Sequence, residues 1–302
     1  MDFEISEEGK MIEDQIVRFL EDKIIPAEQT IATESQDTPN GEDTKTMKKL
    51  RDEAKGLGLW NLYLPDKEWG AGVSNLDYSL LCEHMGRSQI APRVFNCQAP
   101  DTGNAEIIAE FGSTEQKAQF LQPLLSGEAR SCFSMTEPDT SGADPTGLRT
   151  NAVKQGDDYI INGHKWFTSG AVGAHFAIAM VVTNPKGNPH QRTSMLLVPT
   201  NTPGFDLIRP VSVMGHTGGG GHCEIQYKPR RGLARGEYIT VCVQLVWQNA
   251  LLKSCADMQS SERAMEVNWR TSSSFRNGSH RPEWKSIRHG CSLNTLLGRW
   301  IN

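Results

Sequence analysis

The amino-acid sequence predicts an α+β fold, in which a helical region is followed by an antiparallel β domain. Up to about residue 125, apolar residues recur at the spacing of amphipathic helices. From Ser131 onward, short runs rich in β-branched and aromatic residues are separated by turns that contain Gly, Asn or Pro. With 302 residues the chain has room for about two domains. Strands that follow helices, rather than alternating with them, favour separate domains over a doubly wound sheet.

The helical region contains several predicted helices. The first covers residues 12–24 and ends before Pro26, because proline interrupts a helix. Two more are expected at residues 47–57 and around residues 76–81. A further helix follows residues 113–116, whose Ser-x-x-Gln spacing is that of a capping box.

Short strands are predicted throughout the β domain. After a first strand at residue 131, they cover residues 159–161, 166–168, 176–182, 195–198 and 205–208. Asn162-Gly163 is predicted to form a turn between two of them. Such short strands are typical of a barrel-like antiparallel domain.

Composition excludes several classes of function. The net charge of -5 provides no chain-wide attraction for nucleic acid or anionic lipid. The longest apolar stretch, residues 176–182, is far shorter than the ~20 residues that span a bilayer. The seven cysteines include no CxxC pair, and His216, His222 and Cys223 have no fourth partner at a suitable spacing, so no metal site is predicted.

The last quarter of the chain differs from the rest. Residues 227–302 hold 12 Lys and Arg against 5 Asp and Glu, a net charge of +7, whereas residues 1–226 hold 19 against 31, a net charge of -12. Outside residues 239–246 this part shows no sustained helix or strand period. We therefore expect residues 229–302 to form an atypical, poorly packed tail.

Two segments carry residues suited to a ligand. Residues 132–139 (CFSMTEPD) place the end of a strand beside a turn rich in small residues. Residues 162–170 (NGHKWFTSG) place an indole beside hydroxyl groups. Free backbone N–H groups, hydroxyls and an aromatic ring suit a flat, polar ligand.

Together these segments resemble the flavin-binding strands of the acyl-CoA dehydrogenase family, Cys-Phe/Tyr-x-Met/Leu-Thr-Glu-Pro and Trp-Ile-Thr-Asn-Gly. Residues 99–104 (APDTGN) resemble a branch that is fused behind phosphotransferase-like domains in large animal proteins. The resemblance implies an N-terminal helical domain at residues 1–126 and a middle, flavin-binding β domain at residues 127–228. The four-helix bundle that ends members of the family has no match in residues 229–302.

The resemblance implies FAD as cofactor, with its isoalloxazine ring bound by both segments. Thr136 would hydrogen-bond the ring, Trp166 would pack against it, and Thr168 would lie beside the reactive N5. The substrate-facing serine of the family falls on Ala143, and Ser141 lies close enough in sequence to replace it. The complete set of implied cofactor residues is Phe133, Met135, Thr136, Trp166, Phe167 and Thr168.

The family removes the α-proton of a fatty acyl-CoA with a carboxylate base and transfers the β-hydrogen to flavin, a step of fatty acid β-oxidation. The resemblance therefore implies an acyl-CoA substrate, electron-transfer flavoprotein as acceptor, and a homo-oligomer. In the family, the catalytic base and many contacts between subunits come from the C-terminal bundle. Because residues 229–302 do not match that bundle, we assign no catalytic residue, and the homo-oligomer is doubtful for this chain. Glu237, Glu262 and Glu266 are interpreted as surface carboxylates.

Other interpretations stay open at this point. A frameshift or misjoined exon would leave a truncated, non-catalytic remnant with only the helical and β domains. An acyl-CoA oxidase or a flavin monooxygenase can use the same scaffold, because fold alone does not decide function. The acidic start of the chain has no recognisable presequence, which favours the cytoplasm over the mitochondrial matrix and the peroxisome.

Overall fold

A computed structural model describes residues 4–38, 41–142, 144–213, 215, 221–229, 234–235 and 238–239. All of them belong to a unit that spans residues 1–264. Ala143 and most of the predicted tail, including residues 240–302, lie outside the described residues.

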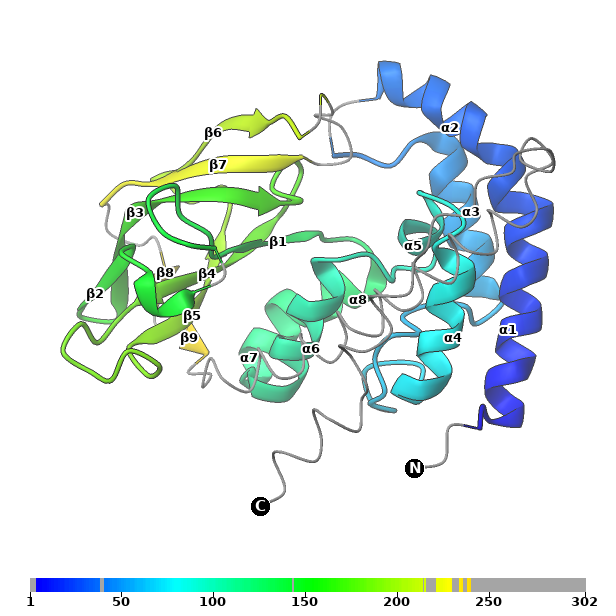
Figure 1. Ribbon diagram of the computed structural model, residues 1–302, viewed down its shortest axis with the longest axis horizontal. Helices are drawn as coiled ribbons and strands as arrows, with labels where there is room; N and C mark the ends of the chain where they lie inside the picture. Colours follow the sequence, from blue (N-terminus) through cyan, green and yellow to red (C-terminus); the bar gives the residue numbers. More distant parts are fainter. Residues whose placement is uncertain are drawn as a thin grey trace, which may run out of the picture. The chain divides into compact units, whose positions relative to one another are not determined.

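Helices form the first part of the chain, as the sequence predicts (Figure 1). They are α1 Glu7–Phe19, α2 Ile25–Asp37, α3 Lys45–Gly56, α4 Asn75–Met85, α5 Ala91–Val94, α6 Asp101–Phe111, α7 Thr114–Gln116 and α8 Gln122–Ser126. The predicted capping box is present: the Gln116 N–H donates to Ser113 Oγ at 3.2 Å, and the Ser113 N–H donates to Gln116 Oε1 at 2.9 Å.

Two π-helical turns, Leu20–Ile24 and Lys117–Leu121, each lead into a helix that begins with a proline in its first turn. The prediction that the first helix ends before Pro26 is therefore wrong, because helical backbone continues through α2. In a π turn the hydrogen bonds reach back five residues, and the Ile25 N–H bonds in this way. Pro26 then lies where a missing N–H costs no helical bond, and Pro123 does the same in α8.

The strands form a mixed sheet. They are β1 Ser131–Ser134, β2 Asn151–Gln155, β3 Asp158–Ser169, β4 Phe176–Val182, β5 Thr193–Pro199, β6 Phe205–Val211, β7 His222–Tyr227, β8 Ala234–Arg235 and β9 Tyr238–Ile239. Their order is β6-β7-β3-β1-β4-β5-β9, with β2 beside β3 and β4, and β8 beside β3. β1 and β2 each pair with β4 in parallel, which the predicted antiparallel domain does not include. Two parallel strands need a long connection between them, and the β2–β3 hairpin is part of the connection between β1 and β4.

β3 runs without a break through Asn162 and Gly163, where the sequence predicts a turn. The glycine meets a different need. A Cβ at position 163 would lie 2.3 Å from Thr150 Oγ1, so only glycine permits this close approach. The two strands predicted at residues 159–161 and 166–168 are therefore one.

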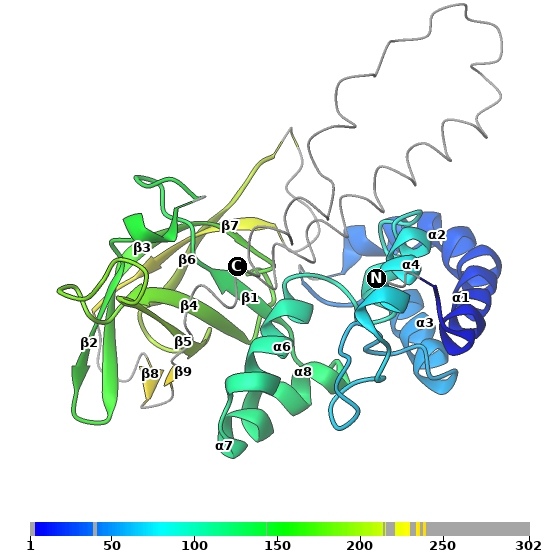
Figure 2. The same ribbon diagram turned by 60° about the horizontal axis from the view of Figure 1, so that its bottom comes forward.

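β4 is buried on both faces, and Figure 2 shows β5 beside it. Phe176, Ile178 and Met180 belong to a core cluster that includes the helices, whereas Ala177 and Ala179 belong to a second cluster. A continuous apolar run is what a strand buried on both faces requires. The helices and the sheet therefore share one core.

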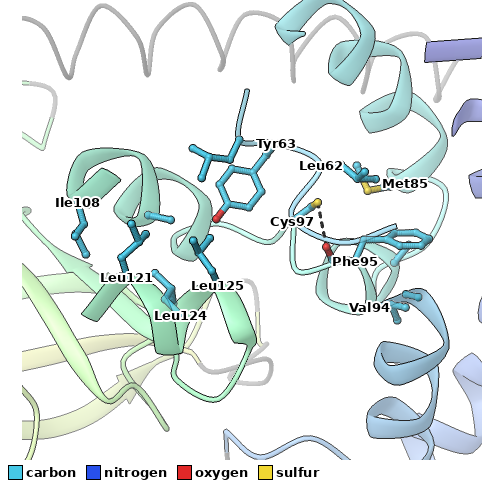
Figure 3. Packing of buried hydrophobic residues seen from close by; sticks show 14 of the residues in the cluster. Leu62, Tyr63, Met85, Val94, Phe95, Cys97, Ile108, Leu121, Leu124 and Leu125 are labelled. Carbon is cyan, nitrogen blue, oxygen red and sulfur yellow. Dashed lines mark hydrogen bonds between the residues drawn. The ribbon is translucent and has the colours of Figure 1, made fainter. Parts of the chain in front are cut away.

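Aromatic residues are prominent in that shared core (Figure 3). Tyr63 and Phe95 are buried there, and the Cys97 thiol donates to the Phe95 carbonyl at 3.3 Å. Phe120 meets Phe176 of β4 with 5.0 Å between ring centroids. This contact joins a helical turn directly to the sheet.

We expect Gly173→Ala to destabilise the chain by about 1–3 kcal/mol more than Gly156→Ala, because the first adds a clash. Both glycines have a positive φ, +77° and +65°. A Cβ on Gly173 would lie 2.7 Å from the Gly41 Cα, whereas nothing lies within 4 Å of one on Gly156. Urea denaturation measures the free energy of unfolding of both variants. Both share the strain of a positive φ, so the difference between them reports the clash. Equal losses of stability would contradict the prediction.

Candidate functional site

The two segments singled out in the sequence lie side by side in the sheet. β1 pairs with β3 antiparallel, with Phe133 opposite Ser169. Beyond the end of β1, the Trp166 N–H donates to the Thr136 carbonyl at 2.7 Å. The backbone of Thr136 is therefore bonded to that of Trp166, so the structure brings these two predicted site residues together.

Side chains of β1 and the segment after it point alternately to two sides. Phe133 and Met135 are half-buried and pack against the core cluster shared with the helices. Ser134 is buried, and its Oγ lies 3.3 Å from Thr168 Oγ1. The predicted contact of Phe133 and Met135 with a flavin stays a prediction.

A loop of small residues folds back onto Thr136. Thr136 is half-buried, and a Cβ added to Gly142 would lie 3.2 Å from its Cγ2. Ser141, the predicted substitute for the family's serine, is exposed on this loop. Ala143, the position on which the family's serine falls, lies outside the described residues.

β3 contains a bulge between Lys165 and Thr168, where its register against β7 shifts. Phe167, inside the bulge, has a φ of +52°, which is uncommon for a bulky residue and is a form of local strain found at functional sites. Its ring is 41% exposed. The bulge therefore presents an aromatic ring outside the sheet.

The bulge also decides which hydroxyls are accessible. Thr168 is 1% exposed, and its hydroxyl faces Ser134 inside the sheet. Ser169 is half-exposed and is the next hydroxyl along the strand. The predicted place of Thr168 beside the reactive N5 stays untested, but the hydroxyl that β3 turns outward here is that of Ser169.

The Trp166 ring lies beside a network of polar and charged side chains that come from β3, β6 and β7. Glu224 accepts a hydrogen bond from Arg209 Nε at 2.8 Å, and its other oxygen lies 2.8 Å from His164 Nε2. The Arg209 Cζ lies 5.4 Å from the centroid of the Trp166 ring, within the range of a cation–π contact. The network holds the indole beside Phe167, with 5.6 Å between ring centroids.

Lys165, which precedes the bulge, forms a buried ion pair. Its Nζ donates to the Met135 carbonyl at 2.7 Å and to Glu137 Oε1 at 3.0 Å. The Glu137 carboxylate also accepts the backbone N–H groups of Arg149 and Thr150, both at 2.8 Å. The pair thus ties the segment after β1 to β3 and to the residues before β2.

The pKa values of the pair follow from burial and mutual attraction. Burial opposes ionisation of Glu137, but Lys165 and the donors at Thr150 and Arg149 outweigh it and lower the pKa of Glu137 below its ordinary value. Burial lowers the pKa of Lys165 to about 8, and Glu137 opposes this. Both side chains are therefore predominantly charged at neutral pH.

A polar cavity of about 150 Å³ opens next to Ser169. The residues that line it include Asp101, Arg130, Ser169, Gly170 and His222. Burial raises the pKa of Asp101, although Ser131 donates to its carboxylate through both the backbone N–H and the hydroxyl. Ser169 Oγ lies 2.7 Å from His222 Nδ1.

Several of these residues were missed in the sequence. Lys165 is a charged residue at an inward-facing, fully buried position of β3, and its partners, the Met135 carbonyl and Glu137, lie about 30 residues earlier, where the sequence gives no sign of the contact. His222 was weighed in the sequence only as a metal ligand, and its hydrogen bond to Ser169 was not predicted. In the described part of the chain no three His, Cys, Asp or Glu side chains gather as a metal site would require. No described helix is long and apolar enough to cross a membrane.

Comparisons with known proteins match both the helical part and the β part of the chain to one family. Residues 6–128 match the model of the acyl-CoA dehydrogenase N-terminal domain, and residues 132–229 match that of the middle domain. Acyl-CoA dehydrogenase family member 10 of Mus musculus is 41% identical over 240 residues, which cover 75% of this chain and 22% of that protein. The chain thus spans less than a quarter of this relative's length.

Solved structures show the same arrangement. An acyl-CoA dehydrogenase-type structure from Mycobacterium abscessus is 33% identical with a TM-score of 0.79, and the match covers 87% of this chain and 68% of that one. A glutaryl-CoA dehydrogenase from Mycobacterium smegmatis, solved in complex with FADH2, has a TM-score of 0.61 at 22% identity, covering 86% and 61%. At that identity the second similarity concerns the fold alone.

Proposed function

Because the chain belongs to the acyl-CoA dehydrogenase family, we propose that it binds FAD and carries out α,β-desaturation of a fatty acyl-CoA in β-oxidation, with electron-transfer flavoprotein as acceptor. The observation that carries the proposal is the bulge of β3. It joins Trp166 to Thr136 by a backbone hydrogen bond and leaves Phe167 exposed beside them. Bound FAD would supply the acceptor for the hydride that leaves the substrate.

The residues present suit such a ring. An exposed aromatic side chain, Phe167, can pack against a flat heterocycle, and the half-buried Thr136 and half-exposed Ser169 offer hydroxyls at its edge. The buried Thr140 Oγ1 has no hydrogen-bond partner among the described residues, which suits a polar ligand at this loop. The Lys165–Glu137 pair holds the two segments in register, so the site needs little reorganisation.

The change from a net negative to a net positive charge after residue 226 favours a second interpretation, a non-catalytic member of the family. If the family's C-terminal bundle is missing, the chain is a remnant that keeps the helical and β domains without a catalytic base. Such a chain would retain part of the flavin site and would not desaturate a substrate. An oxidase on the same scaffold would reduce oxygen instead of electron-transfer flavoprotein.

The visible spectrum of the purified chain, titrated with FAD and then with acyl-CoAs of several lengths without oxygen, tests these functions. Stoichiometric FAD that bleaches with an acyl-CoA supports the dehydrogenase, and bound FAD that never bleaches supports the remnant. A wild-type chain that binds no FAD at micromolar concentration overturns the proposed function. Oxygen consumption during turnover would identify an oxidase or monooxygenase.

A further inference from the structure

Five charged side chains interact where the helical part of the chain joins the sheet. They are Arg51, Arg93, Arg130, Asp43 and Asp101. Asp43 forms ion pairs with Arg51 and Arg93, at 3.2 and 2.7 Å. Arg130 forms no ion pair with the described residues, and its Nη1 donates to the Gly41 carbonyl at 2.6 Å instead.

The charges of this cluster do not balance. Three guanidinium groups face two carboxylates, which leaves one positive charge in excess. Burial lowers the pKa of Arg130, and the neighbouring charge of Arg93 lowers it further, yet a guanidinium keeps its proton at neutral pH. Charged side chains that are removed from water are normally paired. An anion from outside the cluster would complete the pairing of Arg130.

Arg130 lines the polar cavity of about 150 Å³. Gln98 and His222 line it too, and both can donate hydrogen bonds. His222 Nδ1 lies 2.7 Å from Ser169 Oγ, and in either tautomer one of these two side chains keeps a donor that this bond does not use. Asp101 is the one acidic residue among the described residues of the lining, and its Oδ1 already accepts two hydrogen bonds. The cavity is far larger than the ~10–15 Å³ that a single water needs, so it has room for a small ion.

We propose that this cavity binds a small tetrahedral oxyanion, such as phosphate or sulfate, with Arg130 as its principal ligand. A guanidinium can direct two parallel N–H groups at two oxygens of such an ion. Gln98 precedes α6, whereas His222 begins β7, so the bound ion would connect the helical part to the sheet. The inference goes beyond the proposed function and does not depend on it, because it involves neither FAD nor an acyl-CoA.

Titration of the FAD-free chain with inorganic phosphate, in a buffer that contains no other oxyanion, tests the site. Isothermal titration calorimetry measures the affinity, and the midpoint of thermal unfolding should rise along a saturating curve. The general effect of phosphate as a kosmotropic salt does not saturate in this way and is shared by every variant. Arg130→Gln should weaken binding about 10- to 100-fold, because a charge-assisted hydrogen bond is lost. Arg130→Lys, which keeps the charge but not the planar fork, should lie between the two.

Asp101→Asn should change the affinity in the opposite direction. Asparagine keeps an oxygen that can accept from Ser131 but removes the negative charge beside the cavity. Phosphate should therefore bind about 3- to 10-fold more tightly. Arg18→Gln is the matched control, since Arg18 is an exposed arginine of α1 that does not line the cavity, and its affinity should stay within about 2-fold of wild type.

Two results would overturn the inference. One is a wild-type chain without saturable binding at millimolar phosphate, and the other is an Arg130→Gln chain that binds as tightly as wild type. Both compare phosphate-dependent changes, so a lower basal stability of Arg130→Gln does not hide the result. Neither result affects the proposed function, which the FAD titration tests separately.

The source of the oxyanion is a further question that the same titration answers. Phenyl phosphate carries the same group at the end of a larger molecule. Equal binding of phenyl phosphate and inorganic phosphate would indicate the end group of a larger ligand, whereas binding of inorganic phosphate alone would indicate a free ion. Either result supports the site, provided that Arg130→Gln weakens it.

Discussion

Replacing Lys165 by Met should lower the free energy of unfolding by about 3–5 kcal/mol, the usual cost of removing one partner from a buried ion pair. Methionine keeps the chain as far as Cε but has no ammonium, so it leaves the Glu137 carboxylate buried without its cation. The Met135 carbonyl also loses its donor. Since Lys165 is fully buried, bulk solvent does not stabilise the carboxylate charge that remains. Denaturation in urea, with the slope of the transition compared between variants, measures the loss.

Two further variants decide whether the ion pair causes that loss. Lys154→Met removes an exposed lysine of β2 and should change the free energy of unfolding by less than about 0.5 kcal/mol. Adding Glu137→Gln to Lys165→Met should recover stability, because the uncompensated charge disappears. A Lys165→Met loss below about 1 kcal/mol would show that the pair does not hold β1 and β3 together.

Phe176→Ala should cost about 3–5 kcal/mol, because it opens a cavity where the helices meet the sheet. Phe176 is 2% exposed, begins β4 and contacts the Phe120 ring. The loss should appear in a single transition for the helical and β parts, since they share this core. Far-UV circular dichroism and tryptophan fluorescence, followed through the same denaturant range, should then give coincident transitions.

The control is another phenylalanine of the sheet. Phe167→Ala removes a ring that is 41% exposed, so its effect on unfolding should stay below about 1 kcal/mol while FAD binding weakens. Phe176→Leu, which keeps most of the volume, should cost less than about 1.5 kcal/mol. Two separate transitions in Phe176→Ala would mean that the helical and β parts unfold independently.

Hydrophobic periodicity predicted the order of the domains and several elements. The strand predicted at residues 176–182 has those bounds in the structure, and the capping box at Ser113 is formed. These features depend on residues close in sequence, and their patterns were strong. The family was identified from two short segments, and the chain's matches to its N-terminal and middle domains confirm it.

Several features of the structure were not predicted from the sequence. Pro26 does not end its helix because a π turn before it rearranges the hydrogen bonds. Gly163 serves a contact with Thr150 rather than a turn. The buried Lys165 depends on Glu137, and the parallel pairing of β1 with β4 depends on a hairpin inserted between them. For Gly163, Lys165 and β1 the deciding neighbour lies far away in sequence, whereas the π turn before Pro26 is adjacent but leaves no mark in the hydrophobic periodicity.

The bulge in β3 also bears on how sequences of this kind should be compared. The bulge absorbs one surplus residue, so Lys165 and Thr168 both face inward although they are three residues apart. Deleting one residue between Lys165 and Thr168 would restore regular alternation and leave both side chains facing inward. A homologue without the surplus residue would therefore have these two inward positions two residues apart, and an alignment of the two sequences needs a one-residue gap at this point.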